Sequence, residues 1–296
     1  MTHDVGVATR ASVVALCLAA LAPAPASACP CGALVGPSAP VTGAADRWGA
    51  ALNLSGLAEL GRWDSRSGAQ GNPEGASAYR LVVDAAAAWR ATPSLELGLG
   101  VAAGYSAVEN PGQSLTGGGL GDSYARARQE IGLTRAGWVP TGAVWAGLRA
   151  PTASRALSDP GLAMATGLGL GAWEASVGGE LRWALGARVQ LALSGEVGLR
   201  FAGLDGYTPG HRAAVTVTVV HELTQKVSLT AGAGEWMELG VDGSLLRRTT
   251  VSVGAQWRAS LDWRAMARVD VDPLVDGAGS ELPAVVRASL GVAWAR

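Results

Sequence analysis

The chain has 296 residues and a formal net charge of -1, with 49% apolar but only 16% charged residues. The near-zero net charge argues against electrostatic binding of nucleic acid, and apolar runs and aromatic residues along most of the chain argue against disorder. The charged fraction of 16% is low beside the roughly 25% of ordinary soluble domains. Two classes remain: a large secreted β-protein or a membrane β-barrel.

The N-terminal residues have the pattern of a secretory signal peptide. Residues 1–10 are polar and end in an arginine, residues 11–22 are apolar, and Ala26-Ser27-Ala28 is a small-residue cleavage pattern. We therefore expect residues 1–28 to direct Sec export. Residues 29–45 are rich in Pro and Gly and are expected to form an irregular periplasmic segment.

Two cysteines, Cys29 and Cys31, follow the cleavage site directly. Three interpretations stay open: a plain periplasmic tail, lipidation of Cys29, and a weak metal or redox site. Lipidation requires a lipobox, and Ala26-Ser27-Ala28-Cys29 matches one only loosely. No nearby Cys or His completes a metal site, so we predict neither a metal nor a cofactor.

From residue 46 to residue 296 the apolar residues recur with the period of two that is typical of strands. Each predicted segment is long enough to cross an outer membrane, which takes roughly 9–11 tilted residues. The pattern predicts a transmembrane, antiparallel, up-and-down β-barrel of about twelve strands: 47–62, 78–91, 94–107, 122–136, 142–151, 166–185, 188–202, 212–223, 226–239, 246–259, 262–272 and 283–295.

Connection lengths and aromatic residues support the barrel over a secreted sandwich. Long and short connections alternate, as in outer-membrane barrels, and both ends of the barrel then lie on the periplasmic side. Two aromatic girdles are expected. The periplasmic girdle comprises Trp48, Trp89, Trp183, Trp257, Trp263 and Trp294, with Trp138 in a short turn, and the opposite girdle comprises Tyr79, Tyr105, Tyr124, Trp173, Phe201 and Trp236.

Three motifs in the middle of the chain carry a family resemblance. They are Gly117–Asp122 before a strand, Leu148–Thr152 at the end of the next, and the glycine-rich Gly167–Glu174 that opens another. Together they resemble the outer-membrane transporter family associated with meta-pathway phenol degradation. The resemblance implies a barrel that passes small aromatic or apolar solutes. Two departures are Ala153 in place of a glycine and Arg296 in place of a terminal aromatic residue.

Alternation assigns a set of charged residues to the lumen, where a solute would pass. Two interpretations compete: arginines that attract anionic or aromatic solutes, and ion pairs that brace the wall and bind nothing. The candidate solute-pathway residues are Arg80, Asp84, Arg126, Arg128, Glu130, Arg149, Glu174, Glu180, Arg182, Glu196, Arg200 and Arg268. Glu235 counts onto the apolar face, which we interpret as a bulge near residues 232–238 or a shifted register.

Residues 108–121 are expected to form a long outer loop that folds inward as a gate. Its glycines Gly117, Gly118 and Gly119 give it little stiffness, and Asp122 is expected to pin its base. Arg126 and Arg128 would then meet a solute at the constriction. The alternative is an ordinary surface loop.

These patterns predict a channel for passive or facilitated passage of small solutes in the outer membrane of a Gram-negative bacterium. The alternative is a structural or adhesive barrel with a closed lumen and working surface loops. Expected partners are outer-membrane lipid, a small-molecule solute and the barrel-assembly machinery during insertion. No enzymatic role is expected, because His221 points outward and no local motif supports a catalytic base.

Overall fold

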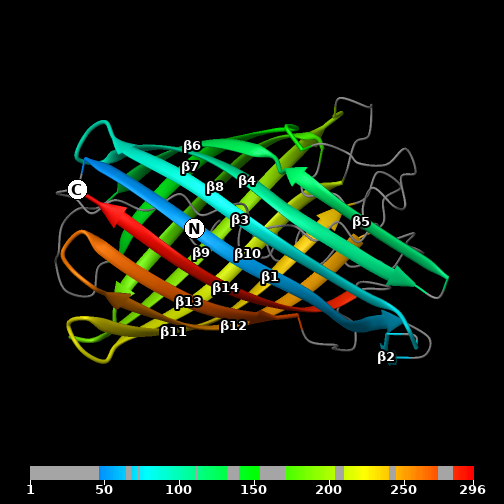
Figure 1. The fold of residues 1–296 in the computed structure, drawn as a ribbon. Helices are drawn as coiled ribbons and strands as arrows, with labels where there is room; N and C mark the ends of the chain where they lie inside the picture. The colour runs from blue at the N-terminus through cyan, green and yellow to red at the C-terminus, as the bar shows by residue number, and fades with distance from the viewer. Residues whose placement is uncertain are drawn as a thin grey trace, which may run out of the picture.

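The structure is a computed structural model that describes residues 47–64, 68–72, 74–110, 112–131, 140–153, 171–203, 210–239, 245–272 and 283–296. Its strands form one antiparallel sheet in which β14 returns to pair with β1 (Figure 1). The described residues form fourteen strands. Within this part of the chain β2 pairs only with β1 and β5 only with β4, so the other twelve close the barrel. The predicted all-β barrel of about twelve strands is confirmed.

The observed strands reproduce most of the predicted boundaries to within a few residues. They are β1 (Trp48–Asp64), β2 (Gly68–Gly71), β3 (Ser77–Arg90), β4 (Leu95–Asn110), β5 (Gln113–Leu120), β6 (Ser123–Ile131), β7 (Thr141–Ala150), β8 (Trp173–Ala184), β9 (Val189–Phe201), β10 (His211–Glu222), β11 (Val227–Leu239), β12 (Leu245–Arg258), β13 (Trp263–Val271) and β14 (Pro283–Ala295). The signal peptide, the segment 29–45 and Cys29 lie outside the described residues, as do 132–136 and 166–170 of two predicted strands.

Four short turns gather at one end of the barrel, called here the turn end: those between β3 and β4, β8 and β9, β10 and β11, and β12 and β13 (Figure 1). The opposite end is called the loop end. In three of these turns a hydroxyl accepts hydrogen bonds from backbone N–H groups two and three residues later: Thr92, Thr224 and Ser260. Such hydroxyl turns reverse the chain in few residues. Each of these hydroxyl residues stands just after the end of a strand, so the chain turns back there within a few residues.

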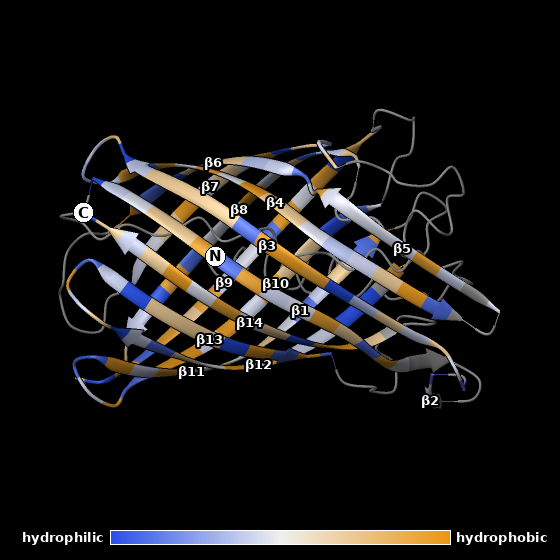
Figure 2. Cartoon of the chain, viewed as in Figure 1, coloured by the Kyte–Doolittle hydropathy of each residue, from blue (hydrophilic) through white to orange (hydrophobic). Residues whose placement is uncertain are grey.

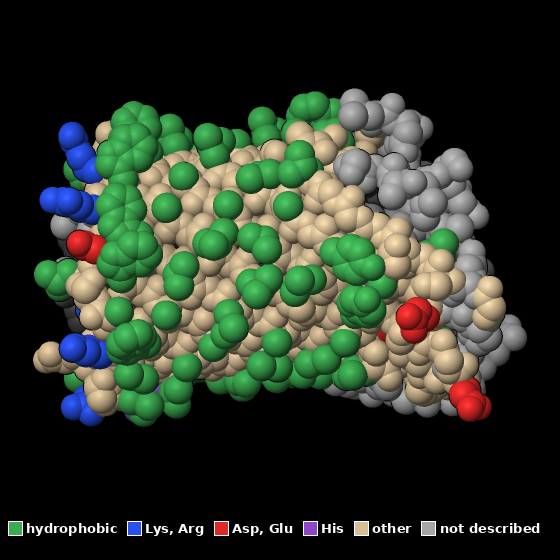
Figure 3. Space-filling view, viewed as in Figure 1, with side chains coloured by type: hydrophobic (Ala, Val, Ile, Leu, Met, Phe, Trp, Pro, Cys, Tyr) green, Lys and Arg blue, Asp and Glu red, His purple; other side chains and the backbone are tan. Residues whose placement is uncertain are grey.

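Hydrophobic and hydrophilic residues alternate along the strands (Figure 2). Because successive side chains in a strand point to opposite faces, the outer face of the barrel is apolar and the inner face is polar. On β3, for example, Tyr79, Leu81 and Val83 are exposed on the outside, while Arg80 and Val82 alternate with them on the inside. Apolar side chains cover the visible wall, and Lys and Arg side chains gather at the turn end (Figure 3). The described residues include no helix long and apolar enough to cross a membrane.

Aromatic side chains stand at both rims, although two of them were assigned wrongly from the sequence. At the turn end the Trp48 and Trp89 rings stack with centroids 6.0 Å apart, and at the loop end Tyr79 and Tyr105 lie 6.3 Å apart. Tyr124 and Trp236 do not belong to a girdle. They occupy lumen-facing positions, since Tyr124 alternates with the outward Ala127 and Gln129, and Trp236 with the outward Ala233 and Leu239. Trp138 lies outside the described residues.

The predicted bulge near Glu235 is absent. The register of β11 with β10 and with β12 runs without a shift through residues 232–238, so Glu235 does face outward. Its carboxylate is paired with the Arg247 guanidinium and accepts a 2.8 Å hydrogen bond from the Thr249 hydroxyl. An outward carboxylate is tolerated here because a neighbouring cation on the same face compensates its charge.

Residues 108–121 form a β-hairpin where a loop was predicted. β4 extends to Asn110, the chain turns at Gly112 with a φ of 82°, and β5 runs back along β4 to Leu120. Asp122 at its base is buried and accepts a 3.3 Å hydrogen bond from the Ala153 N–H. The hairpin has the backbone pairing of a strand, so it is stiffer than its glycine content suggested.

Candidate functional site: the charged lumen of the barrel

All the candidate solute-pathway residues occupy lumen-facing positions of their strands. The structure divides them, however, because most are engaged in networks of ion pairs and a few are not. Two networks of charged side chains and two smaller clusters line the wall of the described residues.

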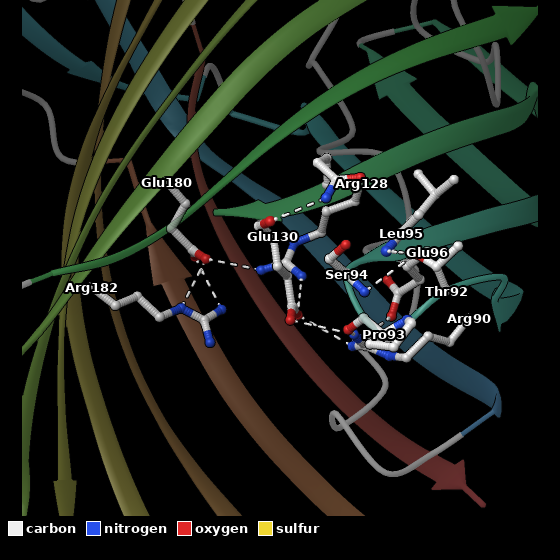
Figure 4. A network of polar contacts seen from close by, with 11 residues as sticks. Arg90, Thr92, Pro93, Ser94, Leu95, Glu96, Arg128, Glu130, Glu180 and Arg182 are labelled. Atoms are coloured by element: carbon white, nitrogen blue, oxygen red, sulfur yellow. Dashed lines mark hydrogen bonds and ion pairs between the residues drawn. The ribbon is translucent and has the colours of Figure 1, made fainter. Parts of the chain in front are cut away.

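The first network, here the Glu130 network, lies toward the turn end (Figure 4). Its Glu130 carboxylate is 2.8 Å from Arg128 and 3.2 Å from Arg90, and Arg128 also lies 3.5 Å from Glu180. Arg182 completes it with a 2.8 Å contact to Glu180, and Arg90 donates a 2.7 Å hydrogen bond to the Pro93 carbonyl. These contacts join β3, β6 and β8 to a short turn, which braces this end of the barrel.

The second network, here the Glu174 network, lies toward the loop end. Glu174 receives 2.8 Å contacts from both Arg200 and Arg212, and Arg200 also reaches Glu238 at 2.7 Å. Arg212 bridges in turn to Glu196. Glu174 and Arg200 are almost fully buried, so each charge is stabilised by the opposite charge beside it and not by water.

Two smaller clusters lie on β12, β13 and β14. Arg248 lies 3.2 Å from Asp272, which also accepts a 2.5 Å hydrogen bond from the Thr250 hydroxyl. Arg268 lies 2.6 Å from Asp270, whose second oxygen is 3.8 Å from Arg287. The Arg268 side chain is 53% exposed although it faces inward from mid-strand, so the barrel interior admits solvent there.

Three of the candidate solute-pathway residues lack a close ion pair among the described residues. Among the described residues, no oppositely charged group lies within 4 Å of Asp84, Arg126 or Arg149. Arg126 instead lies over the Trp145 indole, with its guanidinium carbon 5.7 Å from the ring centroid. The predicted pair Arg126 and Arg128 is therefore split, because Arg128 is neutralised by two carboxylates and Arg126 is not.

Sequence reasoning missed four lumen residues that the networks and clusters use: Trp145, Arg212, Glu238 and Asp272. Trp145 donates a 2.8 Å hydrogen bond from its indole N–H to Glu196, and Arg212 holds two carboxylates. The strand period is the signal that could have found Trp145 and Arg212, because each lies a whole number of two-residue periods from an inward residue of its strand. Asp272 follows the end of β13, where alternation gives no signal.

The structure brings two of the resemblance motifs into contact. The Thr152 hydroxyl donates a 2.8 Å hydrogen bond to the Gly121 carbonyl and accepts one of 2.8 Å from the Ser123 N–H. This contact closes the loop-end junction between β6 and β7, since antiparallel neighbours bring the start of one strand to the end of the next. The chain has a transmembrane barrel fold.

Similarity to a solved outer-membrane channel supports that architecture. The fold is similar to that of an outer-membrane channel from Pseudomonas putida F1, with a TM-score of 0.69 and 14% sequence identity over 85% of this chain and 96% of that chain. The KdgM porin aligns with a TM-score of 0.46 and 9% identity, over 82% of this chain and 98% of that one. The CymD monoaromatic hydrocarbon channel aligns with a TM-score of 0.45 and 10% identity, over 85% and 89%.

No protein-family model matches the sequence. A search of curated proteins likewise finds no match.

Proposed function

We propose that this chain is an outer-membrane channel through which small solutes pass passively. The observation that carries the proposal is a closed, apolar-coated barrel whose inner wall holds charged side chains in contact with solvent, above all Arg268. A structural barrel with a packed interior has no need of exposed charges at mid-strand. A polar lumen with exposed charges is typical of water-filled barrels.

The solute class follows from the unpaired lumen groups. Arg126 and Arg149 offer guanidinium donors that no carboxylate of the described residues neutralises at close range, and Trp145 offers a ring beside one of them. Such groups favour anionic or aromatic solutes through charge and stacking. The motif resemblance to the phenol-pathway transporters points to small aromatic or apolar compounds as well.

The same proposal includes the route to the membrane. Residues 1–28 would act as a Sec signal peptide, 29–45 would form a periplasmic segment, and the barrel-assembly machinery would insert 46–296 into the outer membrane of a Gram-negative cell. The apolar outer face and the aromatic rims would contact lipid there.

Planar-bilayer recording with the purified full chain tests the proposal. We expect discrete conductance steps after reconstitution, and none with the same preparation after heat denaturation. A silent bilayer, together with unchanged solute uptake when the gene is deleted, would overturn the proposal and favour a closed structural or adhesive barrel.

A further inference from the structure

Two aromatic rings lie flat against the lumen wall on β6 and β7, each over a glycine. A Cβ atom at Gly178 would come within 2.5 Å of the Trp145 ring, and one at Gly100 within 2.1 Å of the Tyr124 ring. Both rings therefore occupy space that any other residue would fill. They are held close to the backbone of the neighbouring strands.

Trp145 is also fixed in orientation. Its indole N–H donates to Glu196 at 2.8 Å, and Glu196 is held by Arg212, which is anchored in turn on the buried Glu174. This chain of charge-assisted hydrogen bonds limits rotation of the ring. A rigid ring provides a stacking surface without the entropy cost of ordering it on binding.

Arg126 lies between these rings on the wall. It is two residues from Tyr124 on β6, and its guanidinium carbon is 5.7 Å from the Trp145 centroid. Glu96 and Glu196 attract its charge from beyond 4 Å, without a direct ion pair. A guanidinium stacked on a ring keeps its edge N–H donors available, and that edge matches a carboxylate in a bidentate geometry.

Tyr124 adds an unused polar group. Its hydroxyl is buried and has no hydrogen-bond partner among the described residues, although buried hydroxyls are nearly always paired. Its register neighbour on β7 is Arg149, the second guanidinium with no carboxylate of the described residues within 4 Å. The wall thus offers two guanidinium groups that have no close ion pair among the described residues, beside two preorganised rings. Glu96 and Glu196 act on Arg126, and Glu174 and Asp122 act on Arg149, only from beyond ion-pair distance. A neutral hydrocarbon would use neither guanidinium.

We propose that Tyr124, Arg126, Trp145 and Arg149 form a binding site for small aromatic carboxylates within the lumen. The carboxylate would accept hydrogen bonds from the Arg126 edge, and the arene of the solute would lie against the Trp145 and Tyr124 rings. Arg149 adds positive charge on the loop-end side. The inference rests on the proposed channel function, whose solute it defines more closely.

Block of single-channel current by three carboxylates tests the site. Benzoate carries a charge and an arene, cyclohexanecarboxylate carries a charge and similar bulk without an arene, and acetate carries the charge alone. We expect benzoate to block the parent channel at concentrations at least tenfold lower than acetate, with cyclohexanecarboxylate between them. Arg126→Gln should weaken block by benzoate about tenfold, in keeping with one charge-assisted contact. Trp145→Leu should weaken benzoate more than acetate, because only benzoate stacks.

Arg264→Gln is the matched control, since it removes the same charge from a lumen-facing position on β13, across the barrel in strand order. Equal weakening by Arg126→Gln and Arg264→Gln would show a general field effect and overturn the site. So would equal block of the parent by benzoate and acetate. Tyr124→Phe, which keeps the ring and the fold, should change benzoate block by less than Arg126→Gln does.

Calorimetric titration of benzoate into the detergent-solubilised protein separates this inference from the proposed function. If the parent is silent in bilayers but binds benzoate in an Arg126-dependent manner, channel function fails and the site stands. If the parent conducts but neither block nor heat depends on Arg126, the site fails and the channel stands.

Discussion

At the residue scale, arginine supplies nearly all the positive charge of this protein, since Lys226 is the only lysine. The structure gives a physical reason for that choice. Arg200 and Arg212 each contact two carboxylates at once, which the planar, five-donor guanidinium allows and a single ammonium point charge does less well. Arginine therefore builds networks that join three or four strands through single side chains.

The Glu174 network should contribute strongly to stability because its central members are buried. Changing Glu174 to Gln keeps the shape of the side chain but leaves Arg200 and Arg212 facing each other with one fewer anion. Removing one partner from a buried ion pair costs about 3–5 kcal/mol. We expect Glu174→Gln to lower the urea midpoint of unfolding accordingly, measured by the gel-mobility shift between folded and unfolded barrel.

Glu109→Gln serves as the control, because Glu109 is an exposed carboxylate whose bond to the Ser77 hydroxyl is 3.3 Å long. Exposed polar contacts of this kind contribute roughly 0–1 kcal/mol. A Glu174→Gln variant no less stable than Glu109→Gln would mean that the buried network does not hold the wall together.

At the element scale, the hairpin of β4 and β5 is the largest departure from what the sequence predicted. Glycines suggested a pliable loop at residues 108–121, but eight paired positions continue the barrel wall beyond the membrane-spanning strands. Propensity is a weak guide here because cross-strand pairing with β4 outweighs the entropy cost of glycine. The gating role of Gly117, Gly118, Gly119 and Asp122 stays a prediction, now for a hairpin.

Deleting residues 111–119 tests that role. The barrel should still fold, because among the described residues β5 pairs with no strand other than β4. Removing the hairpin takes protein from the loop-end mouth, so we expect the single-channel conductance to rise above that of the parent. Unchanged conductance in a variant that keeps its folded gel mobility would show that the constriction lies elsewhere.

At the scale of the whole molecule, closure of the sheet decides whether the barrel exists. β1 and β14 pair over thirteen positions, and the first and last described residues are joined where the Arg47 and Trp48 N–H groups both donate to the Arg296 carbonyl at 2.8 Å. Closure leaves no unpaired edge facing lipid, where an unsatisfied backbone group costs several kcal/mol. A complete β14 is therefore required for the barrel to fold.

Truncation after Ser289 examines this dependence. The shortened β14 would leave the turn-end half of β1, from Leu54 back to Gly49, without a partner on its β14 side. We expect the folded, heat-modifiable gel band to disappear and the product to become protease-sensitive. The 111–119 deletion removes slightly more residues but keeps closure intact, so it serves as the comparison. A truncated protein that still shows a heat-modifiable band would contradict the requirement for a complete β14.

The sequence by itself determined the strands, their alternation and the inward or outward side of almost every charged residue. Those properties depend on a local period of two and on turn residues such as Thr92 and Ser260, which act within a few positions.

Tertiary structure alone decided which charges meet. Arg126 and Arg128 share a strand and a face, yet Arg128 reaches Glu130 and Glu180 while Arg126 lies over Trp145. The outcome depends on the register of β6, β7, β8 and β9, and register arises from the pairing of whole strands around a closed barrel. For the same reason the pairing of Glu235 with Arg247 depends on the register of β11 with β12. The inward positions of Tyr124 and Trp236, in contrast, follow from the period of two within their own strands, and the girdle assignment overlooked that period.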